Sequence, residues 1–124
     1  MKRVLVDTSV WVDHFRRPNP ILADLVAFDV ALTHPVVIGE IACGTPPDRE
    51  ATLRMLGKLA RSDQATIPEL IAFIERERLY GQGVGMNDLI LLASARVTPD
   101  TGLWTLDKRL AALAERFGVR YWPA

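Results

Sequence analysis

The segment Arg3-Val4-Leu5-Val6-Asp7-Thr8-Ser9 joins a short apolar run to three polar side chains that follow it without a break. A continuous run of aliphatic and β-branched residues is typical of a strand buried on both faces of a parallel sheet, so we predict a strand over residues 3–6. The side-chain oxygens that come next can cap a helix beginning directly afterwards. A buried strand that leads into a helix is the opening of an α/β fold.

Along the rest of the chain, short apolar segments alternate with longer segments whose apolar residues have helical spacing. Further strands are predicted at 31–33, 65–67, 103–105 and 119–122. Helices are predicted at 11–15, 21–28, 36–43, 48–61, 68–80, 87–97 and 107–117. This order predicts one α/β domain over residues 1–124, built as a three-layer α/β/α sandwich around a short-stranded parallel sheet.

The composition excludes several classes of protein. Lys and Arg number 15 and Asp and Glu number 15, so the chain lacks the basic excess of a protein that binds nucleic acid mainly by charge. Cys43 is the only cysteine, which excludes an intrachain disulfide framework and a cysteine-based zinc site. The first apolar run stops at Asp7, and no later run reaches the ~18 residues of a membrane span. We therefore expect a soluble, cytoplasmic protein without membrane association.

Three carboxylates occupy comparable positions in the predicted fold. Asp7 and Asp107 follow predicted strands, and Asp88 opens the helix after the glycine-rich segment 81–85. Ligands of parallel α/β sheets bind beyond the carboxyl ends of the strands, where such residues meet. Each carboxylate could instead be a helix cap or a favourable charge in a first helical turn.

Glu40 adds a fourth carboxylate, as the only charge in the apolar helix predicted at 36–43. A salt bridge to an arginine is its alternative role. Four carboxylates at one pole repel each other, and Mg²⁺ or Mn²⁺, which prefer oxygen ligands, relieve that repulsion. Two such ions would also suit in-line hydrolysis of a phosphodiester. His14 and His34, the only histidines, do not indicate a Ser-His-Asp triad.

Several segments of the chain resemble PIN-domain proteins, in particular the VapC-type toxins of bacterial toxin–antitoxin pairs. The similarity covers essentially the whole chain in the expected order, and the set of segments is specific although each one alone is loose. The segments are VLVDTSVWV at 4–12, HPVVIGEIACG at 34–44, the stretches 78–88 and 91–95, and LWTLDKRL at 103–110.

This resemblance implies a Mg²⁺-dependent endoribonuclease with a PIN-like fold, for which Mn²⁺ is a substitute ion. The acidic residues of the family correspond to Asp7, Glu40, Asp88 and Asp107. Asp7 and Asp88 would be the principal metal ligands. Glu40 and Asp107 would complete the acidic pocket, either directly or through water.

The resemblance also implies supporting residues and partners. Ser9 and Thr105 would orient the metal ligands through hydrogen bonds. The expected partners are an RNA substrate, a second copy of the chain in a homodimer, and a cognate VapB-type antitoxin whose C-terminal segment crosses the acidic groove.

Contacts to RNA and to a partner are less specific in the sequence. Cations near the predicted site could hold RNA phosphates, whereas those on the helix at 48–61 are expected to form a solvated face. The first set is Arg16, Arg17, Arg78, Lys108 and Arg109, and the second is Arg54, Lys58 and Arg61. An apolar groove for an antitoxin helix is expected around Trp11, Phe15, Ile21, Leu22, Leu25 and Val26.

Three other functions fit parts of the pattern. A phosphatase of the haloacid-dehalogenase type also begins with a strand ending in Asp, but it needs an aspartate where this chain has Ser9. A phosphoacceptor receiver domain would need adjacent acids after the first strand and a late Lys-Pro, and the chain has neither. A non-catalytic binding module on the same fold would be favoured by an incomplete set of acids, and here the set is complete.

Overall fold

A computed structural model describes residues 1–123 of the chain. Its sheet has three parallel strands in the order β2-β1-β3, with β1 (Arg3–Val6) between β2 (Ala31–Leu32) and β3 (Thr101–Trp104). The central strand pairs Val4 with Ala31 on one side and Val6 with Trp104 on the other. The predicted strand at 3–6 is confirmed with the same bounds. A central strand between two parallel neighbours is buried on both faces, and a continuous apolar run is typical of such a strand.

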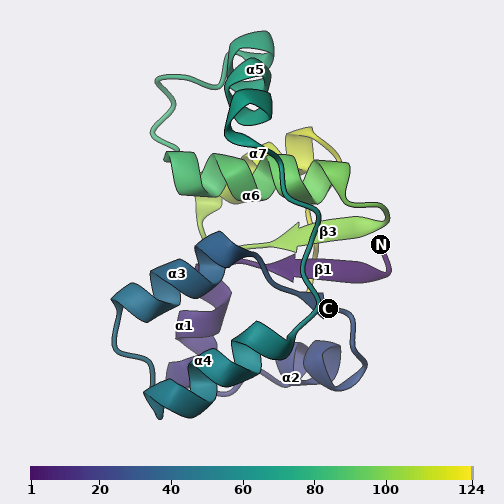
Figure 1. Ribbon diagram of the computed structural model, residues 1–124. Coiled ribbons are helices and arrows are strands. Elements are labelled where there is room, and N and C mark those ends of the chain that lie inside the picture. Colours follow the sequence, from purple (N-terminus) through teal and green to yellow (C-terminus); the bar gives the residue numbers. More distant parts are fainter. Residues whose placement is uncertain (124) are drawn as a thin grey trace.

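Within residues 1–123, seven helices surround the sheet. They are α1 (Thr8–Arg16), α2 (Pro20–Ala27), α3 (Pro35–Cys43), α4 (Arg49–Lys58), α5 (Ile67–Glu77), α6 (Met86–Val97) and α7 (Lys108–Arg116). Figure 1 shows two groups, with α5, α6 and α7 near β3 and with α1 to α4 near β1. The predicted α/β/α class is therefore confirmed.

Two predicted strands are wrong. Residues 65–67 lead into α5, because Thr66 forms a capping box with Glu69 and so ends the extended segment. Residues 119–122 make only an isolated bridge, in which Tyr121 donates its backbone N–H to the carbonyl of Leu103 at 2.9 Å. A period-two apolar pattern identifies a segment that can pair, but it does not say for how many residues pairing continues.

The helix predicted at 48–61 ends three residues early for a similar reason. The backbone N–H of Thr33 donates to the carbonyl of Ala60 at 2.9 Å, and that of Ser62 donates to the carbonyl of Thr33 at 3.0 Å. Residues 59–62 therefore run beside the end of β2 instead of continuing α4. The exposed cations of this helix, Arg54 and Lys58, lie on a solvated face as expected.

The predicted apolar groove is wrong for Trp11 and Leu22, whereas its other four residues, Phe15, Ile21, Leu25 and Val26, are half-buried and stay a predicted partner surface. Trp11 and Leu22 are fully buried, with 1% and 0% exposure, and belong to the hydrophobic core together with the strands. The amphipathic spacing of α2 thus describes a face packed inside the protein. An acidic substitution of Leu22 would test core packing and not partner binding.

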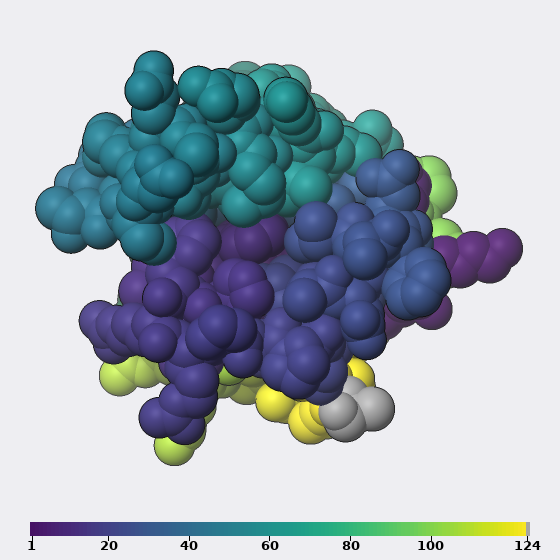
Figure 2. Space-filling model, turned by 90° about the horizontal axis from the view of Figure 1, so that it is seen from below, coloured from purple at the N-terminus to yellow at the C-terminus, as the bar shows by residue number. Residues whose placement is uncertain are grey.

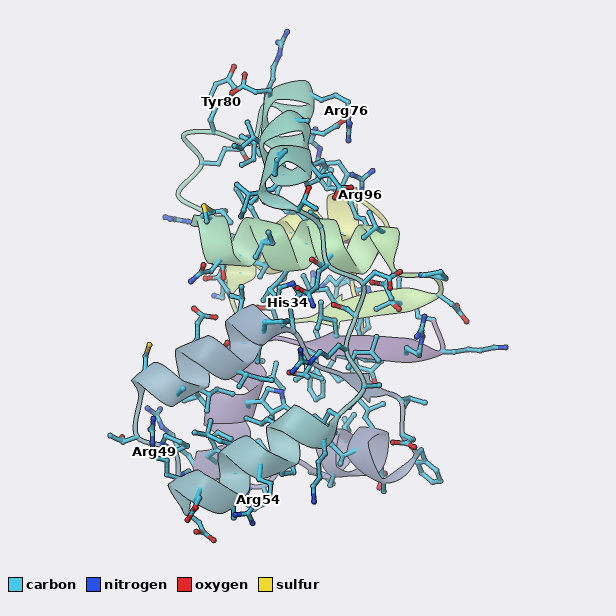
Figure 3. The ribbon with its side chains drawn as sticks, viewed as in Figure 1. His34, Arg49, Arg54, Arg76, Tyr80 and Arg96 are labelled. Atoms are coloured by element: carbon cyan, nitrogen blue, oxygen red, sulfur yellow. The ribbon has the colours of Figure 1, made fainter. Side chains whose placement is uncertain are left out.

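A buried polar contact connects α3 to α6. His34 accepts a hydrogen bond at Nδ1 from the backbone N–H of Val36, which caps α3, and its Nε2 lies 3.2 Å from Oγ of Ser94. Because Nδ1 accepts, the proton of the neutral ring is on Nε2 and is donated to Ser94. Burial, followed by the charge of Arg61, lowers the pKa of His34 and keeps the ring neutral. Figure 3 shows His34 at the start of α3 on the side of α6.

The Ser94 hydroxyl gives a stability prediction. Its oxygen also accepts from the backbone N–H of Ala65 at 3.2 Å, so Ser94→Ala leaves two buried donors without a partner. We expect the free energy of unfolding to fall by about 1–3 kcal/mol in urea denaturation. Ser62→Ala is the matched control, because the buried Ser62 hydroxyl has no hydrogen-bond partner within residues 1–123. Equal losses in the two variants would contradict the proposed role of Ser94.

Candidate active site

Asp7 lies at the end of β1 and directly before α1, with only 4% of its surface exposed. It occupies the N-cap position of α1, yet its side chain makes no capping hydrogen bond. Its Oδ2 instead accepts hydrogen bonds from the hydroxyls of Ser9 and Thr105, both at 2.7 Å. These bonds and the positive end of α1 stabilise the charged carboxylate. Within residues 1–123, Oδ1 makes no hydrogen bond and remains available to a ligand.

The two hydroxyls are themselves fixed by the backbone after β3. Ser9 accepts from the N–H of Leu106 at 3.0 Å, and Thr105 accepts from the N–H of Asp107 at 3.0 Å. Each hydroxyl therefore uses its proton for Asp7 and a lone pair for the chain. The structure thus places Ser9 and Thr105 where the sequence analysis expects groups that orient a carboxylate.

Glu40 reaches the same region from α3, and it is half-buried. Its Oε1 accepts a hydrogen bond from the hydroxyl of Thr8 at 2.8 Å, which links the first turn of α1 to α3. Among residues 1–123 Glu40 makes no salt bridge, so its alternative role as an arginine partner is not realised. The hydrogen bond from Thr8 to Glu40 was not predicted from the sequence. Its only signal in the sequence is that a hydroxyl-bearing residue, Thr8, stands between Asp7 and Ser9 after the strand.

Asp107 and Asp88 enter the site from two helix N-termini. Asp107 is exposed and caps α7, because its Oδ1 accepts from the N–H of Leu110 at 2.9 Å. Asp88 is the third residue of α6, whose N-cap is Gly85. The capping alternative is therefore correct for Asp107, and Asp88 occupies the position of its own alternative, an acid in the first turn of a helix. Capping occupies one oxygen of Asp107 and leaves its other oxygen free.

The pKa of Asp88 reveals how these carboxylates are arranged. Burial, and then the charges of Asp7, Asp107 and Glu40 in decreasing order, together raise this pKa from 3.8 to about 6. Hydrogen bonds give the geometry of the other three acids: Thr8, the residue after Asp7, bonds Glu40, and Thr105 joins Asp7 to the backbone N–H of Asp107. The charges of these three acids act on Asp88, so acids that are distant in the sequence lie in one region of the fold.

A glycine-rich loop sets the approach of α6 to the other carboxylates. Gly83 has a φ of 74°, and a Cβ atom there would collide with the guanidinium of Arg109. Arg109 donates from Nη1 to the carbonyl of Gly83 at 3.3 Å. Arg109, expected from sequence to contact RNA, thus contacts the loop that precedes Asp88.

The donor set fits a hard divalent cation that keeps part of its water shell. It consists of carboxylate oxygens, with a free oxygen on Asp7 and a destabilised charge on Asp88. In the described part of the chain, no three Asp, Glu, His or Cys side chains are placed to enclose an ion alone. Mg²⁺ is usually held by one or two carboxylates together with water and substrate oxygens, so it does not require such a cage.

Comparison with known proteins agrees with this arrangement. Residues 4–116 match the PIN domain family. The chain is also 40% identical to Ribonuclease VapC32 from two strains of Mycobacterium tuberculosis, over 116 residues that cover 94% of each protein.

Replacing Asp88 with Asn should stabilise the metal-free protein. Between pH 3.8 and about 6 the folded protein retains a proton on Asp88 that the unfolded chain has released, so wild-type stability falls as pH rises through this window. At pH 7.5 we expect Asp88→Asn to raise the free energy of unfolding by about 1–2 kcal/mol, allowing for solvent screening. The gain should disappear below the window.

Urea denaturation with EDTA, at pH 7.5 and at a pH below the window of 3.8 to about 6, measures the change in the free energy of unfolding. Asp24→Asn, on the exposed side of α2, is the control that removes one carboxylate away from the site. A stability loss for Asp88→Asn at pH 7.5 would contradict the clustering of the four acids.

Proposed function

The chain belongs to the PIN-domain family, and on this premise we propose that it is a VapC-type endoribonuclease whose carboxylates hold divalent metal ions. The observation that carries the proposal is the convergence of Asp7, Glu40, Asp88 and Asp107 beyond the carboxyl ends of β1 and β3. The similarity to Ribonuclease VapC32 over 94% of the chain supports RNA as the substrate. We further propose that residues 1–124 act as one PIN domain.

Each residue has a distinct part in this mechanism. Asp7 would bind metal through Oδ1, because Oδ2 is occupied by the hydroxyls of Ser9 and Thr105. Asp88 would be the second principal ligand, and its pKa is raised by burial and then by the repulsion that a cation would remove. Glu40 and Asp107 complete the acidic pocket directly or through water. When bound, the divalent ions lower the pKa of the attacking water and stabilise the leaving oxygen of the phosphodiester.

Mg²⁺ is the proposed ion, and Mn²⁺ is the expected substitute. Both prefer carboxylate oxygens and water, which are the ligands that this pocket supplies. The pocket contains no thiolate, because Cys43, the only cysteine, lies exposed at the end of α3. A softer metal would lack its preferred ligands here.

We also propose partners and a location. A cognate VapB-type antitoxin follows from the resemblance to VapC toxins. A homodimer is supported by Ile67 and Ile71, which lie one turn apart on α5 with 46% and 56% of their surface exposed. Among residues 1–123 no helix is long and apolar enough to cross a membrane. The cytoplasm is the proposed location, where both RNA and the antitoxin would be found.

The receiver-domain alternative gains no support from the comparisons or the sequence. Residues 4–116 match the PIN domain family, and the chain lacks both the adjacent acids after β1 and the late Lys-Pro that a receiver domain needs. A binding module without activity gains no support, because all four acids are present and the charges of three of them act on Asp88.

Cleavage of RNA tests the proposed reaction directly. The purified chain with total bacterial RNA and Mg²⁺ or Mn²⁺ should produce fragments, and EDTA should stop the reaction. Asp7→Asn should slow cleavage at least about 100-fold, because it removes a charged ligand at the centre of the site. Asp24→Asn should cleave at the wild-type rate, since Asp24 is exposed on α2. Wild-type cleavage that continues in EDTA, or cleavage by Asp7→Asn at the wild-type rate with metal present, would refute the metal mechanism.

Expression in bacteria tests the toxin assignment. Induction of the chain without a partner should arrest growth, whereas folded Asp7→Asn protein at the same level should not. Mapping the 5′ ends of cellular RNA after induction of each form would identify the cleaved RNA. Normal growth with abundant, folded wild-type protein would argue against a toxin.

A further inference from the structure

A cavity of about 390 Å³ opens beside Glu40, in the size range of roughly 300–1,000 Å³ typical of small-ligand sites. It lies between α1, α3 and the turn after α3, and neither the catalytic proposal nor the family match assigns it a role. Its walls are formed by Val12, Phe15, Arg16, Glu40, Ile41 and residues 44–47. Figure 2 views the face of the molecule on which α1, α2 and α4 are exposed.

The outer wall of this cavity is held in place by hydrogen bonds. Arg49 donates from Nη1 to the carbonyl of Gly44 at 3.0 Å and from Nη2 to that of Ala42 at 2.7 Å. These bonds satisfy carbonyls at the end of α3, and Thr52 donates its hydroxyl to the carbonyl of Pro47. Figure 3 shows Arg49 at the connection between α3 and α4. The wall is therefore formed before any ligand arrives.

The interior combines an aromatic surface, a cation and a link to the acidic site. Phe15 is half-buried, and its ring packs against the ring of Trp11, with the two centroids 6.2 Å apart. Arg16 is exposed and makes no salt bridge within residues 1–123. Glu40 lines the cavity and accepts a hydrogen bond from Thr8, the residue after Asp7, so the cavity adjoins the carboxylate site.

We propose that this cavity binds the nucleobase next to the scissile phosphate of single-stranded RNA. The base stacks on Phe15, and Arg16 contacts the neighbouring phosphate. Sequence-specific proteins commonly recognise unpaired RNA bases by stacking them on aromatic side chains, and backbone contacts need a cation. Among the residues that line the cavity, only Arg16 carries a positive charge. This proposal rests on the proposed ribonuclease function. It states that the preference of the ribonuclease for a particular base beside the cut originates in this cavity.

Cleavage of a randomised pool of short single-stranded RNA tests the proposal. Sequencing of the fragment ends should show that the wild type prefers one base beside the cut. Phe15→Leu keeps an apolar side chain but loses the aromatic face, so it should lose that preference and about tenfold in kcat/KM. Arg16→Ala should raise KM and leave the base preference intact. Phe28→Leu and Arg54→Ala are matched controls, because both residues are exposed and line no part of the cavity.

A second measurement does not depend on cleavage or on the stability of a Phe15 variant. The Asp7→Asn protein is crosslinked to RNA that contains 4-thiouridine, and the modified peptides are identified by mass spectrometry. Crosslinks within residues 12–16 or 44–47 would support the proposal. Crosslinks only elsewhere, together with an unchanged base preference in Phe15→Leu, would overturn it. A wild-type chain that fails to cleave RNA with metal would instead count against the ribonuclease function, and the crosslinks would still decide whether the cavity holds a base.

Discussion

Two hydrogen bonds to one buried oxygen, from Ser9 and Thr105 to Oδ2 of Asp7, are the contacts on which the site depends. A buried carboxylate without such partners would be strongly unfavourable. A separate backbone bond extends the pairing of β1 with β3 to the same residue, because the N–H of Asp7 donates to the carbonyl of Trp104 at 2.9 Å. The backbone of Asp7 is therefore fixed by the sheet and its side chain by the two hydroxyls.

Asp88 reaches this carboxylate against electrostatic repulsion, and the hydrophobic core explains why. Residues 89–95, which follow it in α6, are all buried. Burial of a Leu or Ile side chain contributes about 1.5–3 kcal/mol, so several of them outweigh a repulsion of about 1–2 kcal/mol at a partly solvated site. The position of Asp88 is thus set by the apolar face behind it. A cation would convert this unfavourable cluster into a binding site, which is how a stable fold can maintain a destabilised group.

The sequence predicted the features that depend on local pattern. The strand at 3–6, the helices and the four acids could be located because burial and helix entry leave a mark on neighbouring residues. Strands at 65–67 and 119–122 were wrong, since pairing length is decided by distant segments. Trp11 and Leu22 were wrongly assigned to a partner groove, because an apolar residue does not reveal whether the protein itself or a partner covers it. The bond from Thr8 to Glu40 joins residues 32 positions apart, and no local pattern encodes it.

Helix α1 connects the two parts of the proposed substrate site. Its first turn carries Thr8, which bonds Glu40, and its last turn carries Phe15 and Arg16 at the cavity. Nine helical residues rise only about 13 Å, so one rigid element spans the distance from the carboxylates to the proposed base. Trp11, buried in the middle of α1, fixes the helix in the core. A shift of α1 would therefore move the base, the phosphate contact and the hydrogen bond to Glu40 together, which makes recognition and cleavage depend on the same packing.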